Sequence, residues 1–282
     1  MRRPSLASMG TWLGVALLVL WSVGPIYWAV ATSLTPLSEI GAKPFHLAPP
    51  HLTLDNYQRL FGIVGDGAIW HTISATLVNS IVTSVLATVV CVVLAALGGY
   101  AFARLTFPGR SIIFILVVAT LAIPGYAVLI PLYRLMIGLR LIDTYLGITL
   151  IYVSAYLPLA LWMMRSVFQS LPISLEEAAR LDGASRLGIL FRIVLPIAAP
   201  GLTAVAILTF LGAWGQYIVP LIFSPTLKTK PMTVLIPEYA SKIFTDYGLI
   251  TASGTVAVLI PALIVLTLNR YLVSGLLAGS SK

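Results

Sequence analysis

Side chains that could do chemistry are few in this chain, and they do not group as a catalytic site requires. The histidines are His46, His51 and His71, and no two of them have the i, i+4 spacing with which a helix holds a zinc ion. Cys91 is the only cysteine, which excludes an intrachain disulfide and a cysteine-rich metal site. No lysine stands in the Gly-x-x-x-x-Gly-Lys-Ser/Thr pattern that binds ATP phosphates. We therefore expect no catalytic residue, no metal and no cofactor bound by this chain.

A polar segment at 171–183 is the best candidate for contact with another protein. Ser174 can cap the first amides of a short helix while Glu177, three residues later, reaches back to the cap, which is a reciprocal capping box. Asp182-Gly183 then ends the helix, because glycine accepts the left-handed conformation of a helix stop. The helix carries a small apolar patch, formed by Leu175, Ala178, Ala179 and Leu181. Such a patch could rest against the remaining fold or dock onto a partner.

The composition indicates a membrane protein. Of the 282 residues, 59% are hydrophobic and only 9% are charged, whereas about a quarter of the residues in a soluble domain are charged. The formal net charge is +8, but Lys and Arg form no dense patch with interleaved aromatic residues. This distribution argues against a nucleic-acid partner.

Six uncharged runs are long enough to cross a bilayer, which takes about 20 residues. After the longest runs are trimmed to one crossing, they are 11–34, 76–100, 111–133, 144–164, 200–220 and 247–269. Backbone groups in lipid must be satisfied within each segment, so the runs predict helices, and prolines such as Pro124 and Pro158 are tolerated inside them. The expected fold is an all-α integral membrane protein with six transmembrane helices in a single domain, 1–282.

The distribution of Lys and Arg orients these helices, because short cytoplasmic loops carry an excess of positive charge. With the N-terminus inside, the loop 166–192 and both chain ends are cytoplasmic. The first run, 11–34, is too long for the apolar core of a cleaved signal, about 7–15 residues, although Ala29-Val30-Ala31 resembles a cleavage site. We expect an uncleaved anchor. The inner positive residues are Arg2, Arg3, Arg104, Arg110, Arg165, Arg180, Arg186, Arg192, Arg270 and Lys282, and the fewer outer ones are Lys43, Arg59, Arg134, Arg140, Lys228, Lys230 and Lys242.

A longer motif begins inside the predicted short helix and continues beyond its end. It reads Glu177-Ala178-Ala179, three residues, Gly183, nine residues, Ile193, one residue and Leu195-Pro196. This spacing resembles the signature of permease subunits of binding-protein-dependent ABC importers. Further segments resemble the carbohydrate, maltose-permease-like branch: Phe107-Pro108-Gly109, Pro131-Leu132-Tyr133, Asp143-Thr144-Tyr145 and Asp182-Gly183-Ala184-Ser185. Trp214-Gly215-Gln216-Tyr217 departs from that branch, which commonly has Trp-Asn here.

The resemblance implies a type I importer permease with a cytoplasmic coupling helix at 174–182. In that family the helix inserts into a cleft of a separate ATPase subunit, which holds ATP and Mg, and ATPase closure rotates the transmembrane helices. The residues that the resemblance assigns to coupling are Glu176, Glu177, Ala178, Ala179, Asp182, Gly183, Ile193, Leu195 and Pro196. The implied partners are a second permease subunit, an ATPase dimer and an extracytoplasmic solute-binding protein, in the lipid of a prokaryotic inner membrane.

Polar residues within the spans are candidates for a solute pathway, and they are Asn79, Ser80, Trp214, Gln216 and Tyr217. An amide with aromatic neighbours suits a sugar. The resemblance favours a di- or oligosaccharide, ahead of a monosaccharide, a polyol or a glycerol phosphate ester. The same residues could instead form hydrogen bonds between helices. The alternative function is an ion-gradient-driven carrier, which usually has acids or histidine inside the membrane. The trimmed spans contain neither, and His71 lies near the outer end of the second.

Overall fold

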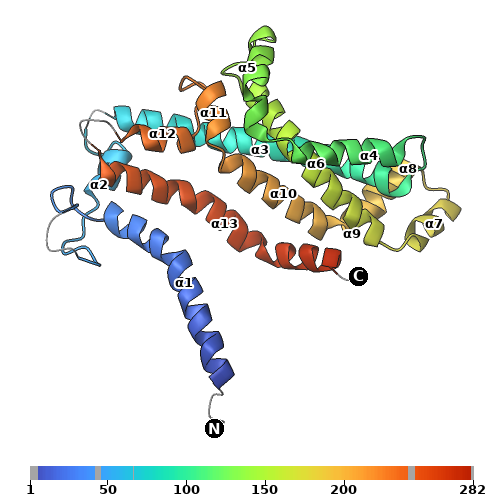
Figure 1. The fold of residues 1–282 in the computed structure, drawn as a ribbon, viewed down its shortest axis with the longest axis horizontal. Helices are drawn as coiled ribbons and strands as arrows, with labels where there is room; N and C mark the ends of the chain where they lie inside the picture. The colour runs from blue at the N-terminus through green and yellow to red at the C-terminus, as the bar shows by residue number, and fades with distance from the viewer. Residues whose placement is uncertain (1–5, 42–45, 66, 241–244, 281–282) are drawn as a thin grey trace. The chain divides into compact units, whose positions relative to one another are not determined.

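The computed structural model describes residues 6–41, 46–65, 67–240 and 245–280, and every regular element among them is helical (Figure 1). The all-α fold class is thereby confirmed. Of the residues used for the orientation, Arg2, Arg3, Lys43, Lys242 and Lys282 lie outside the described residues. The elements are α1 (Leu6–Ser33), α2 (Asp55–Leu60), α3 (Ala68–Arg104), α4 (Arg110–Ala119), η1 (Thr120–Ala122), η2 (Gly125–Val128), α5 (Leu129–Gly138), α6 (Tyr145–Ser170), α7 (Ser174–Leu181), α8 (Arg186–Ile189), η3 (Leu190–Val194), α9 (Leu195–Ile197), α10 (Ala199–Trp214), α11 (Ile218–Phe223), α12 (Met232–Glu238) and α13 (Tyr247–Ser280).

Helices α1, α3, α6 and α13 are each apolar and long enough to cross a membrane. Two bent pairs could each make one further span: Arg110–Ala122 with Gly125–Gly138, and Arg186–Ile197 with Ala199–Trp214. The described chain therefore has four helices that could cross a membrane, or up to six spans if each bent pair forms one, which agrees with an integral membrane protein. Helices α3 and α13 are longer than the runs 76–100 and 247–269, so the ends of the helices do not mark where a span enters the membrane. The exact ranges of the six expected spans therefore stay predictions.

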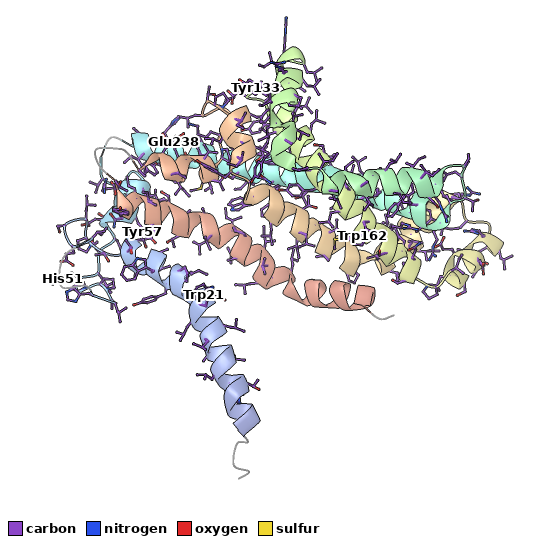
Figure 2. The ribbon with its side chains drawn as sticks, viewed as in Figure 1. Trp21, His51, Tyr57, Tyr133, Trp162 and Glu238 are labelled. Atoms are coloured by element: carbon purple, nitrogen blue, oxygen red, sulfur yellow. The ribbon has the colours of Figure 1, made fainter. Side chains whose placement is uncertain are left out.

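The run 111–133 is interrupted where one helix was expected. α4 passes into the 3₁₀ helix η1, and the chain bends by 94° before η2 and α5. Ile123 and Pro124 have extended backbones, with ψ angles of 122° and 116°, because the ring of a proline disfavours a helical conformation in the residue before it. Pro124 therefore ends the helix instead of kinking it. Figure 2 shows Tyr133 on α5, and its ring packs edge-on against Phe223 of α11 with centroids 5.7 Å apart.

The run 200–220 is also interrupted. α10 ends at Trp214, the connection 215–217 is not helical, and α11 begins at Ile218. On the other side of α10, the chain bends by 76° after the π-helix η3 and the short α9. Pro196 and Pro200 lie at this bend, and each lacks the amide that would continue the helical hydrogen bonds.

The described chain divides into two compact units, residues 1–74 with 235–260 and residues 75–234 with 261–282. Helices α3, α12 and α13 each run through from one unit into the other, because the boundaries fall inside them. The prediction of a single domain over 1–282 therefore stays a prediction.

In the unit that contains α1 and α2, buried polar contacts fasten the ends of the helices. Asn56 on α2 is buried and donates to the carbonyl oxygens of Ser33 and Thr35, both at 3.0 Å. Arg59 on the same helix forms an ion pair with Asp246, which directly precedes α13. The connection after α1 is thereby held to α2, and α2 to the start of α13.

In the unit that contains α7, α6 and α10 lie side by side (Figure 1). The buried apolar core of this part of the chain includes Cys91, Ala95, Tyr100, Val153, Ala160, Met164, Phe168, Ala179, Ile189, Leu190, Val194, Ala198 and Val205. Ala179 belongs to α7 and the others to α3, α6, α8, η3, α10 and the residue before α10. The short helix is therefore packed against the membrane helices.

Gly99 allows α3 to approach α6 closely, as small residues do in membrane helix pairs. A Cβ atom at this position would lie 2.7 Å from Met164 Cβ and 3.0 Å from the backbone nitrogen of Arg165. We expect Gly99→Ala to lower the free energy of unfolding by about 1–3 kcal/mol, the usual cost of overpacking. The melting temperature of the variant in detergent, compared with that of the wild type, measures this loss of stability. Gly254→Ala is the matched control, because among the residues that the structure describes no neighbouring atom lies within 4 Å of a Cβ there. Equal melting temperatures for the two variants would contradict the prediction.

Candidate functional site

The short helix predicted at 174–182 is confirmed as α7, with Asp182 as its C-cap. The predicted capping box is wrong. Ile173 occupies the N-cap position with helical angles (φ −68°, ψ −26°), and no side chain caps the helix. The Ile173 carbonyl accepts hydrogen bonds from the amides of Glu176 and Glu177, at 3.0 and 3.1 Å. Because the chain is already helical at Ile173, Ser174 lies within the first turn, where its hydroxyl cannot act as the cap.

The predicted stop at Asp182-Gly183 is confirmed. Gly183 has a φ of +81°, in the left-handed region that glycine adopts without strain. The Gly183 amide donates to the Arg180 carbonyl and the Ala184 amide to the Ala179 carbonyl, both at 3.0 Å. This pair of bonds is the Schellman motif, which satisfies the last carbonyls of a helix. Ser185 then caps α8, since its Oγ accepts from the Gly188 amide at 3.1 Å.

The two faces of α7 differ sharply. Glu176 and Ala179, three residues apart, are buried, with 1% and 8% of their surface exposed. Leu181, by contrast, is 90% exposed, and Glu177 is also exposed. Of the predicted apolar patch only Ala179 faces the core, because Leu175, Ala178 and Leu181 are all exposed. One face of α7 is therefore anchored in the core, and the other is exposed.

Glu176 is held by a cluster of charged and polar groups from α3. Its Oε1 accepts from Arg104 Nε at 2.7 Å, and its Oε2 accepts from the Tyr100 hydroxyl at 2.9 Å. Arg180 Nη2, one turn further along α7, lies 3.6 Å from the same Oε2. Sequence reasoning named Glu176 but missed Tyr100 and Arg104 as its partners. The i, i+4 spacing of Tyr100 and Arg104 at the end of an apolar run is the signal that could have found them.

The second half of the motif packs behind α7. Ile193 and Leu195 are partly buried against the core to which Ala179 belongs, while Pro196 is exposed. Ile193 lies in the π-helix η3, an element often found at functional positions in helices. α7 contacts both α8 and η3. The spacing from Glu177 to Pro196 therefore corresponds to one packed structure.

Asn79 and Ser80, two of the predicted pathway residues, are buried and form hydrogen bonds to the connection before α12 and to the first residue of α12. Asn79 donates to the carbonyls of Leu227 and Lys230, both at 2.9 Å, and accepts from the Tyr145 hydroxyl. Ser80 Oγ accepts from the Met232 amide at 2.9 Å. These bonds give the two residues a structural role, and their place in a solute pathway stays a prediction.

The other predicted pathway residues lie at the interruption between α10 and α11. Trp214 is buried and stacks on Phe210. Gln216 Nε2 donates to the Tyr156 hydroxyl on α6 at 2.7 Å, and Tyr217 is partly exposed, at 38%. Sequence reasoning missed Tyr156, whose position in the middle of an apolar run carried no signal. The structure thus brings an amide and a phenol together beside a helix break.

Comparison with known proteins gives a consistent set of similarities. Residues 95–277 match the family described as the binding-protein-dependent transport system inner membrane component. A probable ABC transporter permease from Pyrococcus horikoshii is 32% identical over 272 residues, 93% of this chain and 95% of that protein. A trehalose transport system permease from Mycobacterium tuberculosis is 33% identical, covering 94% of each chain. A diacetylchitobiose uptake permease from Streptomyces coelicolor is 33% identical over 92% of this chain and 85% of its own length.

Solved structures share the fold. A chain of a bacterial ABC transporter for the import of the acidic polysaccharide alginate superposes with a TM-score of 0.78 at 21% identity. The superposition covers 96% of this chain and 99% of that chain. A chain of the methionine ABC transporter in inward-facing conformations gives a TM-score of 0.52 at 18% identity, over 75% of this chain and 99% of that one. At these identities the likeness concerns the fold.

Proposed function

Because the chain belongs to the inner membrane components of binding-protein-dependent transport systems, we propose that it is the permease subunit through which such a system imports a di- or oligosaccharide. The observation that carries the proposal is the motif from Glu177 to Pro196, which forms one packed structure with α7 exposed on one face. As a transport subunit, the chain takes its energy from a separate ATPase subunit.

α7 is the part of the chain that would meet the ATPase. It is short, it ends in a Schellman motif, and one face is buried against the membrane helices, so it can transmit force without bending. On its free face, Leu181 offers an apolar contact and Glu177 a carboxylate for a charge-assisted hydrogen bond to an arginine of the ATPase. ATP and Mg would be held by that partner.

The remaining assembly follows from the same proposal. The chain would sit in a prokaryotic inner membrane with α7 and both ends on the cytoplasmic side. It would pair with a second, homologous permease subunit, since one chain supplies half of a pathway, and with two copies of the ATPase. An extracytoplasmic solute-binding protein would deliver the solute.

A sugar is favoured as the solute by the relatives, which are named for the transport of trehalose and the uptake of diacetylchitobiose. Within this chain, Gln216 and Tyr156 offer an amide and a hydroxyl beside the break between α10 and α11. Groups of this kind bind sugar hydroxyls, and aromatic rings stack on the apolar face of a sugar.

An affinity purification tests the assembly. The tagged chain would be solubilised from its native membrane with detergent, and its partners identified by mass spectrometry. ATP hydrolysis would then be measured with added trehalose and diacetylchitobiose. We expect a second permease, a P-loop ATPase and hydrolysis stimulated by one of these sugars. Recovery of the chain without any ATPase would contradict the proposal and favour the gradient-driven carrier.

Gln216→Ala tests the pathway. We expect uptake of the stimulating sugar to lose about three- to tenfold in apparent affinity, the effect of one lost hydrogen bond. Initial uptake rates at a series of sugar concentrations measure this change. Gln169→Ala is the matched control, because Gln169 is exposed near the end of α6, away from the helix break. Unchanged uptake in Gln216→Ala would remove this residue from the site.

A further inference from the structure

Glu176 belongs to α7, but its carboxylate is bound by α3. Arg104 Nε donates to Oε1 at 2.7 Å and the Tyr100 hydroxyl donates to Oε2 at 2.9 Å. The side chains of Arg104 and Glu176 are only 9% and 2% exposed. Buried bonds between charged groups are shorter and stronger than neutral ones and are little screened by salt.

Arg104 also binds the end of α6. Its Nη2 donates to the carbonyl oxygen of Leu171 at 2.7 Å, and Leu171 is the C-cap of that helix. One guanidinium therefore joins the end of α3, the end of α6 and the first turn of α7. Lysine would not reproduce this arrangement, because its three donors share one nitrogen, whereas Nε and Nη2 of the guanidinium are held apart in a rigid plane.

Apolar packing keeps water away from this cluster. The Tyr100 ring meets Phe168 of α6 edge-on, with centroids 5.8 Å apart and planes at 89°. Met164 and Phe168 are fully buried in the same core, which also contains Ala179 of α7. Exclusion of water stiffens the ion pair, because no solvent competes for its hydrogen bonds.

The chain connects α7 directly to α6, through residues 171–173, but not to α3. A displacement of α7 therefore reaches α3 through contacts between packed residues and not through a directly connecting segment. The bonds from Glu176 to Tyr100 and Arg104 are the charge-assisted contacts between these helices. The adjacent Glu177, in contrast, is exposed on the free face of α7.

We propose that Glu176 is a positioning residue that transmits movement of α7 to α3 through its buried ion pair with Arg104, while Glu177 serves the contact with the ATPase. This inference rests on the proposed function, in which the free face of α7 meets an ATPase. The two neighbouring glutamates then have separable roles. Loss of the buried one uncouples transport from ATP hydrolysis, and loss of the exposed one weakens ATPase binding.

The test compares Glu176→Gln with its matched control, Glu177→Gln, in the importer purified through the tagged chain and reconstituted in liposomes. The readouts are the amount of ATPase recovered and the number of molecules of the stimulating sugar taken up per ATP hydrolysed. We expect Glu176→Gln to recover the ATPase fully but to transport about tenfold less sugar per ATP, within the range for residues that carry coupling. Glu177→Gln should recover less ATPase, and the complex that does form should take up as much sugar per ATP hydrolysed as the wild type.

A covalent link tests the mechanical role directly and stays informative if Glu176→Gln folds poorly. Arg104→Cys and Glu176→Cys would be combined in a Cys91→Ala background and joined by a reagent with two methanethiosulfonate ends. We expect the double-cysteine variant to be uncoupled before cross-linking. After cross-linking, it should regain most of the wild-type sugar uptake per ATP hydrolysed.

Two results would overturn the inference. One is wild-type sugar uptake per ATP hydrolysed in Glu176→Gln, and the other is a double-cysteine variant that stays uncoupled after cross-linking. Recovery of no ATPase with the wild-type chain would instead overturn the proposed function, so the two failures are distinguishable.

Discussion

Arg104→Met is expected to lower the free energy of unfolding by about 3–5 kcal/mol, the cost of breaking a buried ion pair by removing one partner. The substitution leaves the Glu176 carboxylate, 2% exposed, without its closest positive charge. It also removes the donor to the Leu171 carbonyl. Tyr100 and Arg180 cannot compensate fully, because the Tyr100 hydroxyl carries no charge and the half-exposed Arg180 guanidinium lies 3.6 Å from the carboxylate, too far for a hydrogen bond.

Unfolding of the full chain in mixed micelles, followed by circular dichroism, measures this effect. The double variant Arg104→Met, Glu176→Gln should recover much of the loss, since no charge is then left buried and unpaired. Arg134→Met is the control, because Arg134 is exposed on α5 and its loss should change stability by less than about 0.5 kcal/mol. If Arg104→Met unfolded like this control, the ion pair would contribute nothing to the fold.

Gly183→Val is expected to abolish most transport while the membrane helices stay folded. A β-branched residue at φ +81° is strained, by about 1–2 kcal/mol for an ordinary L-residue, and relieving the strain breaks the two bonds that end α7. No atom of the described chain lies within 4 Å of a Cβ at this position, so crowding inside the chain is not the cause.

Sugar uptake per complex and the helical circular dichroism signal measure this prediction together. Gly183→Asn is the matched comparison, because asparagine tolerates the left-handed region far better than valine. We expect Gly183→Asn to keep several times more transport than Gly183→Val. Equal loss in both variants would indicate that the side chain collides with the ATPase and that backbone strain is not the cause.

The position of α7 could be predicted closely from the sequence, and the way it is held could not. Asp182-Gly183 specifies a local backbone conformation, which adjacent residues determine by themselves. The cap at its start was misjudged because the capping pattern of Ser174 and Glu177 assumes an extended residue at the cap, whereas the chain is already helical at Ile173. The bond from Glu176 to Arg104 joins residues that lie far apart in the sequence, and no local pattern reports it.

Hydropathy predicted where the membrane helices lie but not where they break. An apolar run has the same composition whether its helix is straight or interrupted, so 111–133 read as one span. Proline disfavours a helical conformation in the residue before it, but membrane helices often continue through a proline when neighbouring helices satisfy the freed carbonyls. Whether the helix ends at Ile123 and Pro124 or only kinks there is therefore a tertiary property. The hydrogen bonds from Asn79 to the carbonyls of Leu227 and Lys230 were not predictable either, because they join residues that are far apart in the sequence.

The most direct test of the central claim is uptake by the reconstituted complex when every ion gradient has been collapsed with ionophores. Proteoliposomes would carry the complex with its solute-binding protein, and ATP would be supplied on the side that bears α7. We predict sugar uptake that requires ATP and is unaffected by the ionophores. Uptake that needs no ATP and follows an imposed proton or sodium gradient would contradict the account.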